Sequence, residues 1–172
     1  AGGWAIDCFL GVRTREHADV EFALLRRDQR QVHAHFAHGR LRKAVDRALE
    51  DWNAGEDLSL PVHEVHVDFP SGDRLELLLN ESDADDWVYR RDPRVRMPLR
   101  EAFLDRPGAP LLAPEIVLLY KSRHLRAVDH ADFRMAAPAP VVIDSGGYED
   151  LSLSRTRYEW INALDDLLDE SS

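Results

Sequence analysis

The chain has 172 residues, of which 44% are hydrophobic and 31% are charged, and its formal net charge at pH 7 is −10. This composition is typical of a globular domain with a core of its own, alone or with a helical appendage. The negative charge argues against a nucleic-acid-binding surface, which needs clustered lysine and arginine, and it suits a cationic small-molecule partner. No apolar run reaches the roughly 20 residues that span a bilayer, and the start lacks a secretory pattern, so we expect a cytoplasmic protein without a membrane partner.

The first predicted element is a helix over about 2–11, opened by Gly2-Gly3 and followed by a basic loop. Cys8 in this helix is the only cysteine, which excludes an intrachain disulfide and a cysteine-based zinc site. We expect Cys8 to be a small core residue. Apolar and charged residues then alternate over 18–25, which predicts a strand.

Two acids of this strand, Asp19 and Glu21, lie two residues apart and therefore share a face, where their charges repel. An antiparallel strand with one solvated face alternates apolar and charged residues in the same way, so the spacing alone also fits an ordinary strand of this kind. Upstream, however, Gly2-Gly3 begin a helix whose N–H groups and dipole favour a phosphate. A phosphate site followed by paired acids indicates a metal–nucleotide site.

The middle of the chain contains one predicted helix and a β-rich region. "RRDQRQVHAHFAH" is typical of a helix capped near Asp28, whereas residues 39–58 are compatible with either a helix or a strand. "PVHEVHVDF" and "DRLELLLNE" are predicted to form a hairpin around the turn-forming "PSG". A short strand over 87–90 follows.

The last third of the chain is predicted to be helical. "APEIVLLYKSRHLRAVDHADFRM" begins with Pro114 and Glu115 in first-turn positions, which favours a helix start. "PAPVVIDSGG" interrupts the pattern, and a final amphipathic helix follows through Tyr158 and Leu168.

The histidines give no metal site. His63 and His66 of "HEVH" would face opposite sides of a strand. His33, His35 and His38 lack the i, i+4 spacing with which two imidazoles share a metal on a helix.

Four segments in order, "AGGWAIDCFLG", "TREHADVEFALLRRDQ", "RLELLLNE" and "APEIVLLYKSRHLRAVDHADF", resemble the aminoglycoside and lincosamide nucleotidyltransferases of the DNA polymerase β-like superfamily. The resemblance spans residue 1 to about 137. It implies an α+β fold, with a nucleotidyltransferase-type mixed β-sheet flanked by helices over 1–110. A helical C-terminal region over 111–172 would pack on this core. The family's strand that precedes the two glycines is expected ahead of residue 1.

The resemblance also implies an activity. A nucleoside monophosphate would pass from a nucleoside triphosphate, in the first place ATP, to a hydroxyl of a small molecule such as an aminoglycoside-like antibiotic. Gly2 and Gly3 would hold the nucleotide phosphates, and Asp19 and Glu21 would be catalytic ligands of Mg²⁺. Trp4 follows the glycines, as in the aminoglycoside branch, where much of the superfamily has serine.

Three further residues match family positions. Arg15 and Lys121 would contact the nucleotide, and Glu76 would be the general base for the acceptor hydroxyl. The alternative third acid is Asp68. If Pro70 to Asp73 form the loop, Glu76 lies opposite Val67 and the two candidates face opposite sides of the hairpin. Family position favours Glu76, which we expect within about 5 Å of the paired acids.

Two alternative functions share the fold. One is a nucleotidyltransferase of a toxin–antitoxin pair that modifies a protein or tRNA, although the basic surface that tRNA requires is not evident. The other is a non-catalytic nucleotide-binding domain that has lost productive metal geometry.

Overall fold

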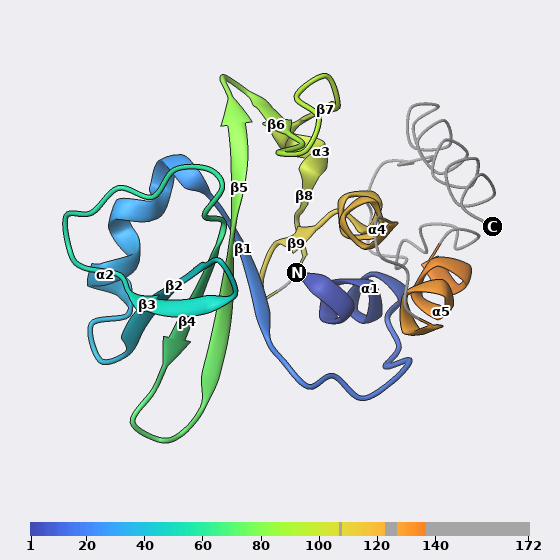
Figure 1. Ribbon diagram of the computed structural model, residues 1–172. Coiled ribbons are helices and arrows are strands. Elements are labelled where there is room, and N and C mark those ends of the chain that lie inside the picture. Colours follow the sequence, from blue (N-terminus) through green and yellow to red (C-terminus); the bar gives the residue numbers. More distant parts are fainter. Residues whose placement is uncertain (107, 123–126, 137–172) are drawn as a thin grey trace.

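The computed structural model describes residues 1–106, 108–122 and 127–136 (Figure 1). Its helices are α1 (Gly2–Leu10), the 3₁₀ helix η1 (Arg26–Gln31), α2 (Val32–His35), α3 (Leu99–Ala102), α4 (Pro114–Lys121) and α5 (Ala127–Ala136). Its strands are β1 (Glu21–Leu25), β2 (Arg40–Val45), β3 (Ala48–Asp51), β4 (Glu64–Asp68), β5 (Arg74–Asp83), β6 (Asp86–Val88), β7 (Arg96–Pro98), β8 (Phe103–Leu104) and β9 (Leu111–Leu112). Within these residues no helix is long and apolar enough to cross a membrane.

Seven of the described strands form one mixed sheet. Its order is β3-β2-β4-β5-β6-β7, and β1 adds to β5. The β1–β5 pair is parallel, whereas all the other pairs are antiparallel. This arrangement agrees with the predicted α+β class and mixed sheet.

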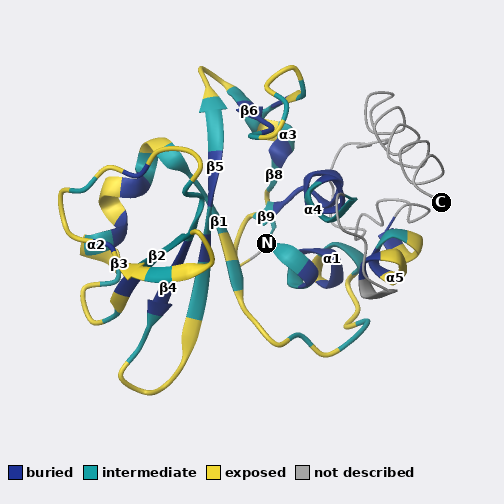
Figure 2. Ribbon diagram, in the orientation of Figure 1, coloured by how far each residue is buried: buried dark blue, intermediate teal, exposed yellow. Residues whose placement is uncertain are grey.

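Helices flank the sheet on two sides, and a hydrophobic cluster lies on each (Figures 1 and 2). On the η1–α2 side, Val65, Val67 and Leu77 of the sheet pack with Val32. On the other side, α1 and α4 pack against each other and against Trp87, which is completely buried. Glu21 of β1 lies on the same face of the strand as Ala23, which packs against the second cluster. The strand begins at Glu21, so Asp19 precedes it instead of lying on the strand predicted over 18–25.

Helix α1 matches its predicted range. It ends at Gly11, whose φ of 70° is the left-handed conformation that closes many helices. The prediction for Cys8 was wrong, because its side chain is exposed. Cys8 lies two residues beyond the buried Ile6, about 200° around the helix, and therefore points away from the core.

The region after β1 differs from its prediction. The expected helix is a 3₁₀ helix followed by a single α-helical turn, and Asp28 lies inside η1 instead of capping it. Residues 39–58 contain the hairpin β2–β3, so the strand alternative is the correct one. Asp46 and Arg47 form its two-residue turn with φ values of 47° and 68°, a conformation that matches the twist of paired strands.

The hairpin β4–β5 is present, but its predicted register was wrong by one residue. Asp68, and not Phe69, pairs with Arg74. The reason is Gly72, whose φ of 94° adds one residue to the turn, so that the Phe69 N–H donates to the carbonyl of Asp73 at 2.9 Å. Glu76 therefore lies opposite His66, and it shares a face with Asp68 instead of opposing it.

The described residues cover only part of the predicted helical region over 111–172. Pro114 occupies the first turn of α4, and α5 continues the helical segment after residues 123–126, which lie outside the described residues. The short pair β8–β9 joins residues on either side of the proposed boundary at 110. That boundary stays a prediction, and the final helix near Tyr158 and Leu168 lies outside the described residues.

Candidate active site

A cavity of about 670 Å³ opens between the sheet and the helices α1, α4 and α5. Six of the seven residues predicted for the site line it: Gly2, Gly3, Arg15, Asp19, Glu21 and Lys121. Glu76, the seventh, does not line the cavity but lies on the strand next to Glu21.

The two glycines allow α1 to approach the acidic strand. A Cβ atom at Gly2, which has a φ of 56°, would lie 1.3 Å from Oε2 of Glu21. A Cβ atom at Gly3 would lie 2.3 Å from Nη2 of Arg15 and 2.5 Å from the ring of His17. Both positions therefore require glycine for close packing, independently of the predicted contact with phosphate.

The loop before β1 is fixed to α1 by Asp7. This carboxylate is 4% exposed; Thr14 Oγ1 donates to its Oδ1 at 2.5 Å, and His17 Nε2 lies 2.6 Å from its Oδ2. Although burial opposes the change, these two hydrogen bonds lower the pKa of Asp7 below its ordinary value. The indole N–H of Trp4 donates to the carbonyl of Asp19 at 3.1 Å and so fixes the backbone beside the paired acids.

Among the described residues, no lysine or arginine forms an ion pair with Asp19 or Glu21. Burial and the neighbouring Asp19 raise the pKa of Glu21 above its ordinary value, although the Ala1 ammonium and Lys121 act in the opposite direction. Like charges held together in a cavity without an ion-pair partner are typical of a binding or catalytic site.

Glu76 is the lateral neighbour of Glu21, because the two residues pair across the parallel strands β5 and β1. Burial raises the pKa of Glu76; the charge of His66 opposes this change, and the carboxylates of Glu64, Asp19 and Glu21 add to it. His66 Nδ1 lies 4.0 Å from Glu76 Oε1.

Asp68, the alternative third acid, lies on the same face but is neutralised. Arg42 and Arg74 contact its carboxylate at 2.5 and 2.7 Å. Although burial acts in the opposite direction, these arginines lower the pKa of Asp68. An acid held by two guanidinium groups is a poor proton acceptor, so the geometry favours Glu76 over Asp68.

Arg15 and Lys121 are brought together by two acids of α5 that the sequence analysis missed. Asp132 accepts hydrogen bonds from Nε and Nη2 of Arg15, both at 3.1 Å, and its Oδ2 lies 3.0 Å from Lys121 Nζ. Lys121 Nζ also donates to Asp129 Oδ1 at 2.7 Å. The spacing of Asp129 and Asp132, three residues apart in "DHAD", indicates one helix face and could have identified this pair.

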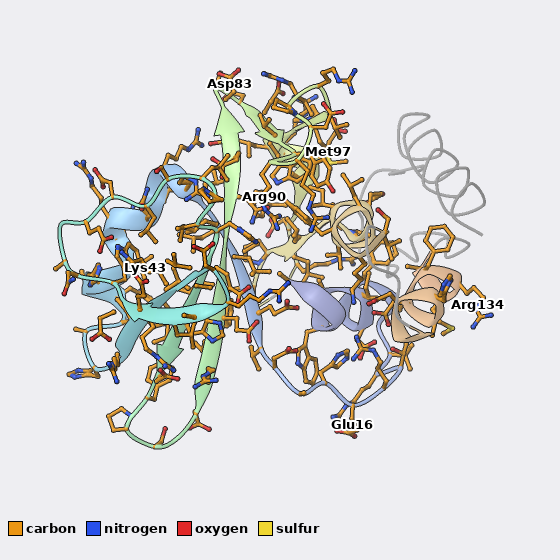
Figure 3. The ribbon with its side chains drawn as sticks, viewed as in Figure 1. Glu16, Lys43, Asp83, Arg90, Met97 and Arg134 are labelled. Atoms are coloured by element: carbon orange, nitrogen blue, oxygen red, sulfur yellow. The ribbon has the colours of Figure 1, made fainter. Side chains whose placement is uncertain are left out.

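Other residues that line the cavity were also missed. Glu64 lies on β4, Arg90 and Arg91 follow β6, and Tyr120 lies on α4. Figure 3 shows Arg90 between β5 and α4. No motif marks these positions, because they meet only through the sheet order and the packing of α4.

Among the described residues, no group of three or more histidine, cysteine or acidic side chains is arranged to hold a metal ion. Magnesium commonly binds to proteins through one or two carboxylates, with water and substrate phosphates as its remaining ligands.

Comparison with known proteins shows that the fold of this chain is similar to that of two solved structures. No protein-family model and no curated protein sequence matches the chain. Two solved structures are similar, each with a TM-score of 0.52. The lincosamide antibiotic adenylyltransferase LnuA, solved with lincomycin bound, is 17% identical over 80% of this chain and 83% of its own. The antibiotic-resistance factor ANT(2'')-Ia is 16% identical over 99% of this chain and 82% of its own. The chain therefore has the fold of these two proteins.

Proposed function

We propose that the protein is a nucleotidyltransferase that moves a nucleoside monophosphate from a nucleoside triphosphate, in the first place ATP, to a hydroxyl group of a small antibiotic-like molecule. The observation that carries the proposal is the pair of acids Asp19 and Glu21 in a cavity beside Gly2-Gly3. Neither acid forms an ion pair with a lysine or arginine of the described residues. The likeness of fold to an adenylyltransferase of lincosamide antibiotics supports the same assignment.

The donor set fits magnesium. Asp19 and Glu21 offer hard carboxylate oxygens, and the part of the raised pKa of Glu21 that comes from the neighbouring Asp19 supports a cation at this position. When bound, Mg²⁺ would neutralise charge on the triphosphate and on the group being transferred. Its remaining ligands would be phosphate oxygens and water.

The chain's own residues would position and activate the acceptor. Glu76 would accept the proton of the acceptor hydroxyl, whose oxygen then attacks the α-phosphorus in line with the leaving pyrophosphate. The raised pKa of Glu76 suits a base that must hold this proton. Gly2 and Gly3 would allow the start of α1 to lie close to the nucleotide phosphates.

Charge also supports a cationic acceptor. The chain has a net charge of −10, and Glu16 and Glu64 add two carboxylates to the lining of the cavity. An amine-bearing molecule would be attracted to this side of the site by ordinary Coulomb forces.

The test is a pyrophosphate-release screen with several nucleoside triphosphates, Mg²⁺ and a panel of hydroxylated antibiotics. We expect Asp19→Asn and Glu21→Gln to abolish transfer while the fold is kept. Glu76→Gln should lower kcat with nucleotide binding largely retained. The matched control is Glu50→Gln on β3, an exposed acid outside the cavity.

Near-normal turnover of Asp19→Asn or Glu21→Gln at saturating Mg²⁺ would refute the assignment of the paired acids. Metal-dependent nucleotide binding by the wild-type protein without release of pyrophosphate for any acceptor would instead identify a non-catalytic binding domain.

A further inference from the structure

The cations that line the cavity fall into two groups. Arg15 and Lys121 are ion-paired with Asp132, which is 3% exposed, and Lys121 also contacts Asp129. Their positive charge is therefore already compensated inside the protein. Arg90 and Arg91 line the same cavity but form no ion pair with any carboxylate in the described part of the chain.

Aromatic rings hold both of these arginines. Cζ of Arg90 lies 4.4 Å from the ring centroid of Tyr120. Cζ of Arg91 lies 5.6 Å from the same centroid, and its Nη1 lies 3.2 Å from both the Tyr89 hydroxyl and the Tyr120 carbonyl. A ring face attracts a guanidinium group but does not neutralise it. The two arginines are thus positioned while their charge stays available.

This aromatic platform is rigid because it belongs to the core. The rings of Tyr89 and Tyr120 lie 5.1 Å apart, and each is about 6.1 Å from the fully buried Trp87. The arginines therefore need little ordering when an anion binds, which favours affinity.

We propose that Arg90 and Arg91 bind the terminal phosphates of the nucleoside triphosphate, and hence the pyrophosphate that leaves. This inference rests on the proposed function and assigns the polyphosphate contact to a different pair from Arg15 and Lys121. A polyphosphate needs uncompensated positive charge, and the planar guanidinium fork can donate two hydrogen bonds to one phosphate group. Arg15 and Lys121 would then mainly fix the loop before β1 to α4 and α5.

The test measures binding alone, by calorimetric titration of inorganic tripolyphosphate, MgATP and AMP into the wild-type protein and its variants. We expect Arg90→Gln and Arg91→Gln each to weaken tripolyphosphate and MgATP binding about tenfold or more. AMP binding should change less than about twofold, since AMP lacks the terminal phosphates. Arg91 is exposed, so its variant keeps the test valid even if Arg90→Gln fails to fold.

The matched control is Arg94→Gln. Arg94 lies in the same loop, pairs with Asp92 and does not line the cavity, so its loss should leave all three affinities unchanged. Tripolyphosphate binding that survives both Arg90→Gln and Arg91→Gln within about twofold would overturn the inference and leave the proposed function standing. A wild-type protein that binds neither tripolyphosphate nor MgATP would overturn both. Arginine-dependent tripolyphosphate binding without transfer to any acceptor would support this inference and count against the proposed function.

Discussion

Replacing Asp132 with asparagine tests how the N-terminal loop is held to the C-terminal helices. Asp132 is 3% exposed and accepts two hydrogen bonds from Arg15, which lies 117 residues away in the sequence. It also contacts Lys121. The substitution keeps the size of the side chain but removes the charge that compensates both cations.

The size of the effect follows from burial. Breaking a buried ion pair by removing one partner costs about 3–5 kcal/mol, because a charge is left without compensation in a poorly solvated position. Lys121 keeps its contact with Asp129, and the asparagine oxygen can still accept one hydrogen bond from Arg15. We therefore expect Asp132→Asn to lower the free energy of unfolding by the lower end of this range, about 3 kcal/mol. With a urea m-value of about 2 kcal/mol/M, the unfolding midpoint would fall by about 1.5 M.

The assay is urea unfolding followed by circular dichroism, with Asp57→Asn as the control. The pair Arg30–Asp57 is shorter, at 2.6 Å against 3.1 Å, but its side chains are 81% and 53% exposed. Solvent screens such a pair, so its loss should leave the midpoint unchanged. If Asp132→Asn shifted the midpoint no more than Asp57→Asn, burial would not be what makes the Arg15–Asp132 pair strong.

Three further predictions concern the same region. Gly3→Ala should destabilise the fold by about 1–3 kcal/mol in urea unfolding, because its Cβ would overlap the Arg15 and His17 side chains; an unchanged midpoint would contradict that packing. The lowered pKa of Asp7 means that its stabilisation is present above the ordinary value of about 3.9 and is lost as the pH falls through the lowered folded value. The difference in midpoint between wild type and Asp7→Asn should therefore shrink in acid. The raised pKa of Glu21 has the opposite effect, because its ionised carboxylate destabilises the folded state. Glu21→Gln should therefore be more stable than wild type at pH 8, and the difference in unfolding midpoint should close toward pH 4.

Local signals in the sequence predicted the elements that depend on short-range physics. The helix that begins at Gly2, the strand that carries Glu21 and the turn around "PSG" all follow from periodicity or from residues with special backbone preferences. Gly3 and Asp19, both predicted from the sequence as site residues, line the same cavity.

Features that depend on long-range contacts could not be predicted from local signals in the sequence. The register of the hairpin β4–β5 depends on the left-handed conformation of Gly72, and a shift of one residue reverses the face on which every side chain lies. The partnership of Arg15 with Asp132 depends on how α5 packs, which no local pattern encodes. Arg90 lies in a loop without any motif, and it reaches the cavity only because α4 places Tyr120 beneath its guanidinium group.

These long-range contacts also explain why the cavity can keep like charges side by side. The pairs made by Asp132 hold the loop before β1 in place without using Asp19 or Glu21, so the paired acids are not needed to anchor the chain. Burial and the neighbouring Asp19 raise the pKa of Glu21, so the ionised carboxylate lowers the stability of the fold, and the Ala1 ammonium and Lys121 offset only part of this cost. Groups that weaken the folded state in this way are retained most readily where a bound ligand supplies the opposite charge. Under the proposed function, Asp19 and Glu21 would take a cation, and Arg90 and Arg91 after β6 would take a polyanion.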